Sequence, residues 1–173
     1  MSSFLLHRFC PVAVLAVALA LAVPALAAEA QPLGAHKDWS SWMFEEKEGK
    51  VCFMQTKPRK SEGKYTRRGD VYLQVTHRPA EGSFDVVSLT AGYSFKPGSD
   101  LSVKIDGRSF TLLTSGERAW ALDEAGDRQL TDAILKGKQM VVKGVSSRGT
   151  ETTDTYSLSG STAAHKAIDK ACR

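Results

Sequence analysis

Short segments in which apolar and polar residues alternate with a period of two recur along this chain of 173 residues. Residues 101–105 alternate in this way, Asp106-Gly107 follows, and residues 108–112 resume the pattern. Alternation of this kind is typical of strands with one buried face. Asp-Gly between two such segments favours a type I′ hairpin turn. The pattern predicts a β protein.

The remaining segments extend this prediction to most of the chain. Strands are predicted at 39–46, 50–56, 70–78, 83–91, 118–122, 138–145 and 153–158. Leu130 and Ile134 recur at helical spacing within 127–136, and Ala164 and Ile168 do so after Gly160. We therefore predict a mostly β fold, an antiparallel β-sandwich or partly closed barrel, with a short internal helix and a C-terminal helix. The choice between sandwich and barrel stays open.

The first 27 residues have the features of a secretory signal peptide. Arg8 supplies a positive charge, an apolar run covers 12–23, and Ala25-Leu26-Ala27 forms a small-x-small cleavage site. The alternative is a retained membrane anchor, but the run is shorter than the roughly 20 residues of a spanning helix. Residues 28–38 are interpreted as a flexible leader and 39–173 as a single β domain. No transmembrane segment is expected after cleavage.

Cleavage leaves two of the three cysteines, Cys52 and Cys172. In an exported protein, an even number of cysteines favours a disulfide. This bond would close most of the mature chain into one loop and stabilise it by about 5 kcal/mol in the chain-entropy model. Two free thiols are the alternative. No metal site is expected, because two distant thiols and scattered histidines do not make a ligand set.

No motif of a known catalytic centre is found in the sequence. A hydrolytic set of His77, Asp85 and a serine is one hypothesis, although the sequence does not show that they are close. We prefer to interpret His36, His77 and His165 as ordinary surface or strand-end histidines. We therefore predict a non-enzymatic protein with no cofactor.

The segment 57–69 lacks periodicity and is predicted to be a loop. It concentrates positive charge around a single acid, Glu62, and its cations are Lys57, Arg59, Lys60, Lys64, Arg67 and Arg68. Such a surface patch attracts anionic headgroups, glycans or an acidic partner. A solvated loop without a partner is the alternative. Nucleic acid is not expected, because the mature chain has 22 lysines and arginines against 19 acids, too small an excess.

Two further polar stretches have a structural and a functional interpretation. Arg68-Gly69-Asp70 spells a tripeptide that integrins recognise in exposed loops, but its place at the start of a strand favours a structural role. The run 146–155 is a candidate binding loop, although hydroxyl groups that cap the backbone before a strand are the preferred interpretation.

Four stretches together resemble the invasion-associated locus B family of exported bacterial proteins. They are VCFMQTKPRKSEG, RRGDVYLQVTHRP, DVVSLTAGYSFKPGS and SSRGTETTDTYSLSG. The resemblance extends from Trp39 to Cys172. It implies a periplasmic or envelope-associated protein of a Gram-negative bacterium. The family name refers to a locus linked to entry into red blood cells, which is a virulence phenotype and not a mechanism.

We therefore expect an envelope binding module whose partner is a protein, an envelope component or a host-cell surface. The alternative is a periplasmic inhibitor or chaperone-like protein that acts on another exported protein. The sequence leaves the partner and the oligomeric state open.

Overall fold

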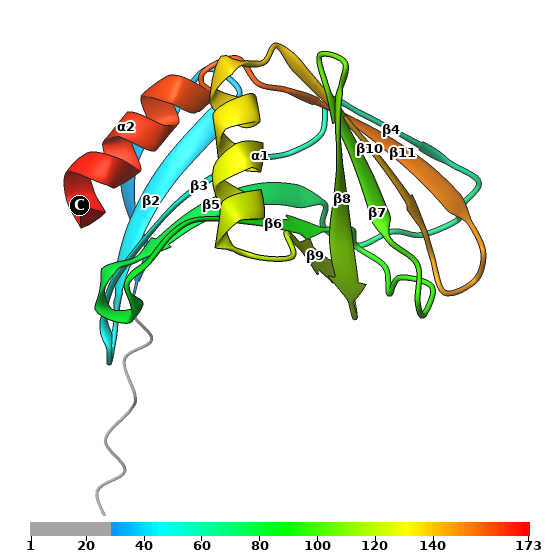
Figure 1. Cartoon of the computed structure of the whole chain (residues 1–173), viewed down its shortest axis with the longest axis horizontal. Helices are drawn as coiled ribbons and strands as arrows, with labels where there is room; N and C mark the ends of the chain where they lie inside the picture. Colours follow the sequence, from blue (N-terminus) through cyan, green and yellow to red (C-terminus); the bar gives the residue numbers. More distant parts are fainter. Residues whose placement is uncertain (1–28) are drawn as a thin grey trace, which may run out of the picture.

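The computed structural model describes residues 29–173, so the predicted signal peptide lies outside the described residues. Its strands form one antiparallel sheet in the order β1-β2-β3-β5-β6-β9-β8-β7-β10-β11-β4 (Figure 1). The strands are β1 Gln31–His36, β2 Trp39–Glu46, β3 Gly49–Thr56, β4 Lys60–Gly63, β5 Tyr72–Arg78, β6 Ser83–Thr90, β7 Leu101–Ile105, β8 Arg108–Ser115, β9 Arg118–Trp120, β10 Gln139–Val145 and β11 Glu151–Ser157. The helices are a 3₁₀ turn Pro79–Glu81, α1 Glu124–Lys136 and α2 Ser161–Cys172.

This architecture confirms the predicted class, a mostly β fold with an internal and a C-terminal helix. The sheet bends through β8, whose first half pairs with β7 and whose last residues pair with β9. It does not close, because β1 and β4 remain at its two edges. Of the two predicted arrangements, the partly closed one describes the sheet.

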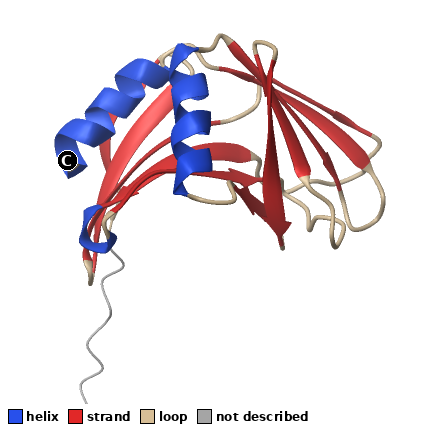
Figure 2. Cartoon of the chain, viewed as in Figure 1, coloured by secondary structure: helices blue, strands red, loops and turns tan. Residues whose placement is uncertain are grey.

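Both helices lie over the half of the sheet that contains β2, β3, β5 and β6 (Figure 2). The strand alternation explains why, since Cys52 and Met54 of β3 and Leu73 and Val75 of β5 are fully buried on that face. Ile168 of α2 packs into the same core. No helix within residues 29–173 is both long and apolar enough to cross a membrane.

The hairpin predicted at Asp106-Gly107 forms as β7 and β8. Both turn residues have positive φ, 44° at Asp106 and 92° at Gly107. Two positive φ angles are the signature of a type I′ turn, whose twist matches that of the strands. This turn was therefore predictable from two adjacent residues.

Two predictions about irregular segments are wrong. The expected flexible leader contains β1, which pairs with β2 through a bulge between Pro32 and Gly34. The expected loop 57–69 contains β4, which pairs with β11 at the other edge. Neither strand has an alternating apolar pattern, because backbone hydrogen bonds to a single neighbour hold an edge strand in place. All four residues of β4 are exposed.

The two helix ends depend on different residues. Asp123 caps α1 by accepting a hydrogen bond from the backbone N–H of Gly126 at 2.7 Å, so the helix begins a turn earlier than predicted. Gly160 precedes α2 with φ 99°, and a Cβ there would lie 1.8 Å from the carbonyl oxygen of His36. A glycine is therefore required where α2 meets the end of β1.

The predicted disulfide is present. It joins Cys52 of β3 to Cys172 at the end of α2, with Cα atoms 6.0 Å apart. This separation is ordinary for a disulfide. The bond attaches the last helix to the sheet.

Candidate functional site

A polar groove of about 550 Å³ lies where three segments meet. We call it the basic groove, and its walls come from residues 64–68, 92–94 and 146–148 together with Thr150 and Thr152. Backbone hydrogen bonds hold the segments together. The N–H of Ser147 donates to the carbonyl of Ser94 at 2.7 Å, and the N–H of Gly69 donates to that of Gly92 at 2.9 Å. The segments that form the groove are therefore fixed to one another and are not independent loops.

Arg68, which lines the basic groove, forms an ion pair that is buried beneath it. The guanidinium of Arg68 donates two hydrogen bonds, of 2.8 and 2.6 Å, to the carboxylate of Asp154. The side chains of Arg68 and Asp154 are only 6% and 4% exposed. Burial acts to lower the pKa of Arg68, but the hydrogen bond and charge of Asp154 outweigh it and raise that pKa. Arg68 is thus permanently charged, and the carboxylate of Asp154 compensates its charge.

Arg68 makes further contacts that fix its position. Its Nε donates to the carbonyl of Ala91 at 2.7 Å, and its guanidinium lies 5.0 Å from the ring centre of Tyr93 and 5.5 Å from that of Tyr65. Such cation–π contacts are stabilising. The prediction that Arg68 is an exposed cation is wrong, and its buried contacts give it a structural role within Arg68-Gly69-Asp70.

Three other cations line the groove and are exposed, namely Lys64, Arg67 and Arg148. Within the described part of the chain, none of the three forms an ion pair, and no carboxylate lines the groove. Hydroxyl groups supply much of the remaining lining, including those of Ser94, Ser147 and Thr150. The groove therefore presents uncompensated positive charge together with neutral hydrogen-bonding groups, which suits an anion.

The other predicted cations lie outside the groove and have acidic partners. Lys57 pairs with Asp70 at 3.3 Å, Arg59 pairs with Asp38, and Lys60 pairs with Glu62 at 2.8 Å. The structure thus brings together Lys64, Arg67 and Arg68 but not the first half of the predicted patch. Arg148 was missed, although the polar run 146–155 had been singled out.

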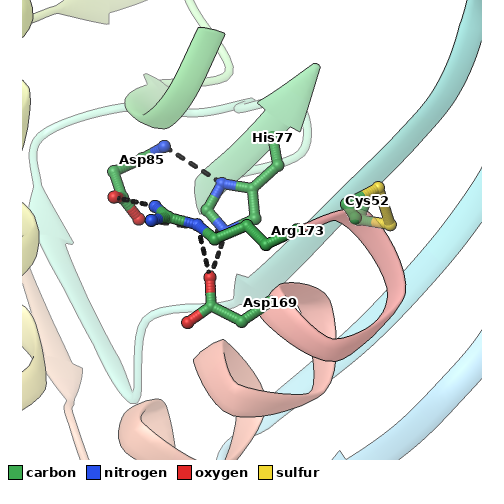
Figure 3. Close-up of a disulfide and its surroundings, with 6 residues drawn as sticks. Cys52, His77, Asp85, Asp169 and Arg173 are labelled. Atoms are coloured by element: carbon green, nitrogen blue, oxygen red, sulfur yellow. Dashed lines mark hydrogen bonds and ion pairs between the residues drawn. A yellow bond between two sulfur atoms is a disulfide. The ribbon is translucent and has the colours of Figure 1, made fainter. Parts of the chain in front are cut away.

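A second cluster joins α2 to the sheet beside the disulfide (Figure 3). We call it the histidine–aspartate cluster, and it consists of His77, Asp85, His165, Asp169 and Arg173. His77 Nδ1 accepts a hydrogen bond from the backbone N–H of Asp85 at 3.0 Å, and its Nε2 lies 3.0 Å from Asp169 Oδ1. His77 is fully buried. His77 therefore lies near the end of β5, as predicted, but it is buried and is not a surface histidine.

The remaining members form ion pairs around this histidine. His165 Nε2 lies 2.6 Å from Asp85 Oδ1 and its Nδ1 3.1 Å from Asp169 Oδ2. Arg173 contacts both carboxylates, with its Nε 2.8 Å from Asp169 Oδ1. Burial acts to raise the pKa of Asp85, but the hydrogen bond and charge of His165 outweigh it and lower that pKa. Each carboxylate therefore has cationic or hydrogen-bond donating neighbours.

Ligand atoms of His77, Asp85 and His165 all lie within 4.8 Å of one another, a spacing compatible with a bound metal ion. The hydrogen bonds of His77 argue against this role. Its Nδ1 accepts a backbone N–H, so in the neutral ring Nε2 carries the proton and has no lone pair for a metal. Burial lowers the pKa of His77, which favours this neutral ring. We interpret the cluster as an attachment of α2 to the sheet.

Two comparisons place the chain among known proteins, and a third finds no match. Residues 39–169 match the family described as Invasion associated locus B (IalB) protein. A solved structure, the crystal structure of invasion associated protein B from Bartonella henselae, matches with a TM-score of 0.53 and 17% identity. The alignment covers 80% of this chain and 96% of that one, and at this identity it shows a shared fold only. The search of curated proteins finds no match.

Proposed function

Because this chain belongs to the Invasion associated locus B family, we propose that it is an exported envelope protein that acts as a non-enzymatic binding module. We propose further that the basic groove is its binding site and that the ligand is anionic. The observation that carries this proposal is the set of three unpaired cations, Lys64, Arg67 and Arg148, on a rigid floor without a carboxylate among the described lining residues. A host-cell surface is one anionic partner that fits.

The buried Arg68–Asp154 pair supports this function by holding the groove in one shape. An anion that enters the groove meets cations already in place, so little conformational entropy is lost on binding. The same pair argues against the alternative, an inhibitor or chaperone-like protein acting through a projecting loop. Arg68 fixes the segment 64–71 to the body of the protein.

The proposal of a non-enzymatic role rests on how the histidine–aspartate cluster is used. Both ring nitrogens of His77 are engaged, with a backbone amide and with Asp169. Both ring nitrogens of His165 face carboxylates. A general base needs a free lone pair directed at substrate, and neither ring offers one.

The test compares two triple variants of equal charge. The groove variant carries Lys64→Ser, Arg67→Ser and Arg148→Ser, and the control carries Lys57→Ser, Arg59→Ser and Lys60→Ser. Each basic residue near an anionic surface contributes about 1 kcal/mol, so the groove variant should bind roughly a hundredfold more weakly. The control should lose far less, because its cations are paired with Asp70, Asp38 and Glu62.

Binding is measured by co-sedimentation with phosphatidylglycerol vesicles and by retention on immobilised heparin, each at low and physiological salt. Vesicle binding alone identifies a headgroup site, and heparin binding alone identifies an acidic-glycan site. Equal losses in the two variants would show that net charge, not the groove, is responsible. Absence of binding by the wild-type protein to both probes would refute the proposal.

A further inference from the structure

The face of the sheet opposite the helices carries a second groove, of about 480 Å³, which we call the sheet-face groove. Its side chains come from β2, β3, β5, β6 and β9 and from Glu81 of the 3₁₀ turn. In an antiparallel sheet with one packed face, the other face is normally polar. Here that face presents Phe53, Tyr72 and Trp120, all only partly buried.

The strand register shows how the polar and aromatic groups are arranged in this groove. Gln74 of β5 lies opposite Ser88 of β6, and Ser88 lies opposite Trp120 of β9. On the other side, Phe53 of β3 lies opposite Thr76 of β5. A strip of neutral hydrogen-bonding side chains is therefore flanked by aromatic rings on two sides. The three strand spacings from β3 to β9 span about 14 Å.

The charges in the groove are largely neutralised. Arg78 lies 2.5 Å from Glu46 and 3.4 Å from Glu81, so it is satisfied within the protein. Arg118 is exposed and has no ion pair among residues 29–173. An anion would find a single free cation here, in contrast to the basic groove. The sheet-face groove therefore suits a ligand without a large charge.

The same lining excludes two other kinds of ligand. A hydrocarbon chain would cover Gln74, Thr76 and Ser88 without offering them hydrogen bonds, which is costly. An extended peptide that adds a strand needs an unpaired sheet edge. However, β3, β5 and β6 are interior strands with neighbours on both sides.

We propose that the sheet-face groove binds a neutral oligosaccharide. Sugar rings combine apolar C–H faces, which stack on aromatic rings, with hydroxyl edges, which hydrogen-bond to amide and hydroxyl side chains. Trp120 and Phe53 supply the apolar platforms, and Gln74 and Ser88 supply the hydrogen bonds. The span between the aromatic rings fits a short oligosaccharide better than a single sugar ring.

The experiment titrates the ¹⁵N-labelled mature protein with maltohexaose, cellohexaose and chitohexaose. At least one should give saturable shifts at the indole N–H of Trp120 and the side-chain amide of Gln74. Trp120→Leu and Gln74→Ala should each weaken binding about tenfold, since each removes one contact to the ligand. Tyr65→Leu is the control, because Tyr65 is an exposed aromatic residue that lines the basic groove and not the sheet-face groove.

A cooperative thermal transition and an unchanged dispersion of the backbone amide signals show that each variant is folded. No saturable shift with any of the three sugars overturns the proposal. It is also overturned if Tyr65→Leu weakens binding as much as Trp120→Leu, or if the shifts fall on the basic groove. None of these outcomes depends on whether the basic groove binds anions.

Discussion

At the scale of single residues, the buried pair of Arg68 and Asp154 holds the segment 64–68 of the basic groove in place. Removing one partner of a buried ion pair leaves an uncompensated charge and costs about 3–5 kcal/mol. We predict a loss of this size in the free energy of unfolding for Arg68→Ala and for Asp154→Ala, measured by urea denaturation. Arg67→Ala should change stability by no more than about 0.5 kcal/mol, because Arg67 is an exposed surface residue.

A double variant separates the ion pair from simple loss of packing. Arg68→Met with Asp154→Leu replaces both charges by apolar groups of similar size, which is often neutral or stabilising. We expect the double variant to be more stable than either alanine variant. A double variant that is as unstable as both singles combined would contradict this account of the pair.

At the scale of elements, α2 is attached to the sheet by covalent and non-covalent contacts. The disulfide holds its C-terminal end. Near its start, Ser161 Oγ donates to the carbonyl of Ile134 of α1 at 3.1 Å, and Ser41 Oγ of β2 donates to the carbonyl of Ala164 at 3.0 Å. The N-terminal half of α2 should therefore stay docked when the bond is absent.

We predict that Cys172→Ser lowers the free energy of unfolding by roughly 2–5 kcal/mol, because the bond restricts the unfolded chain. Wild type under strong reductant should lose the same amount, whereas reductant should not affect the variant. Hydrogen exchange should show the greatest loss of protection in the last turn of α2. Equal stability of oxidised and reduced wild type would refute this role of the bond.

At the scale of the whole molecule, the histidine–aspartate cluster couples global stability to pH. Burial, the largest cause, holds the pKa of His77 below its ordinary value of 6.5, although Asp85 and Asp169 oppose the shift and Arg173 reinforces it. The unfolded chain therefore takes up a proton at higher pH than the folded chain does. The contribution of His77 to stability is fully present above about pH 6.5 and is lost as the pH falls below it.

We predict that the free energy of unfolding of the wild type decreases as the pH is lowered from about 7.5 to about 5. Urea titrations at each pH measure it. His77→Gln should show a shallower fall whatever its absolute stability, because glutamine can accept and donate hydrogen bonds but does not titrate. The contribution of Asp85, whose pKa is lowered below 3.8, is lost only at more acidic pH. If the free energy of unfolding depends on pH equally in wild type and His77→Gln, His77 does not cause the pH dependence.

Local residue patterns by themselves determined the β class, most strand positions, the tight turn at Asp106-Gly107 and the presence of two helices. The cysteines at positions 52 and 172 also predicted the bond that the structure contains. The first features depend on residues that are close in sequence, and the disulfide prediction depends on the number of cysteines in the mature chain. Alternation with a period of two records which face of a strand is buried, and Asp-Gly tolerates the positive φ angles that its turn requires.

Only the tertiary structure decided which charged side chains are free to contact a ligand and which are paired inside the protein. Arg67 and Arg68 are adjacent in sequence, yet one is exposed in the groove and the other is buried against Asp154, 86 residues away. His77 likewise finds Asp169 92 residues away. The edge strands β1 and β4 could not be predicted either, because backbone pairing leaves no mark in the side-chain pattern. The availability of a charge depends on its distant partners, and chain folding alone brings these together.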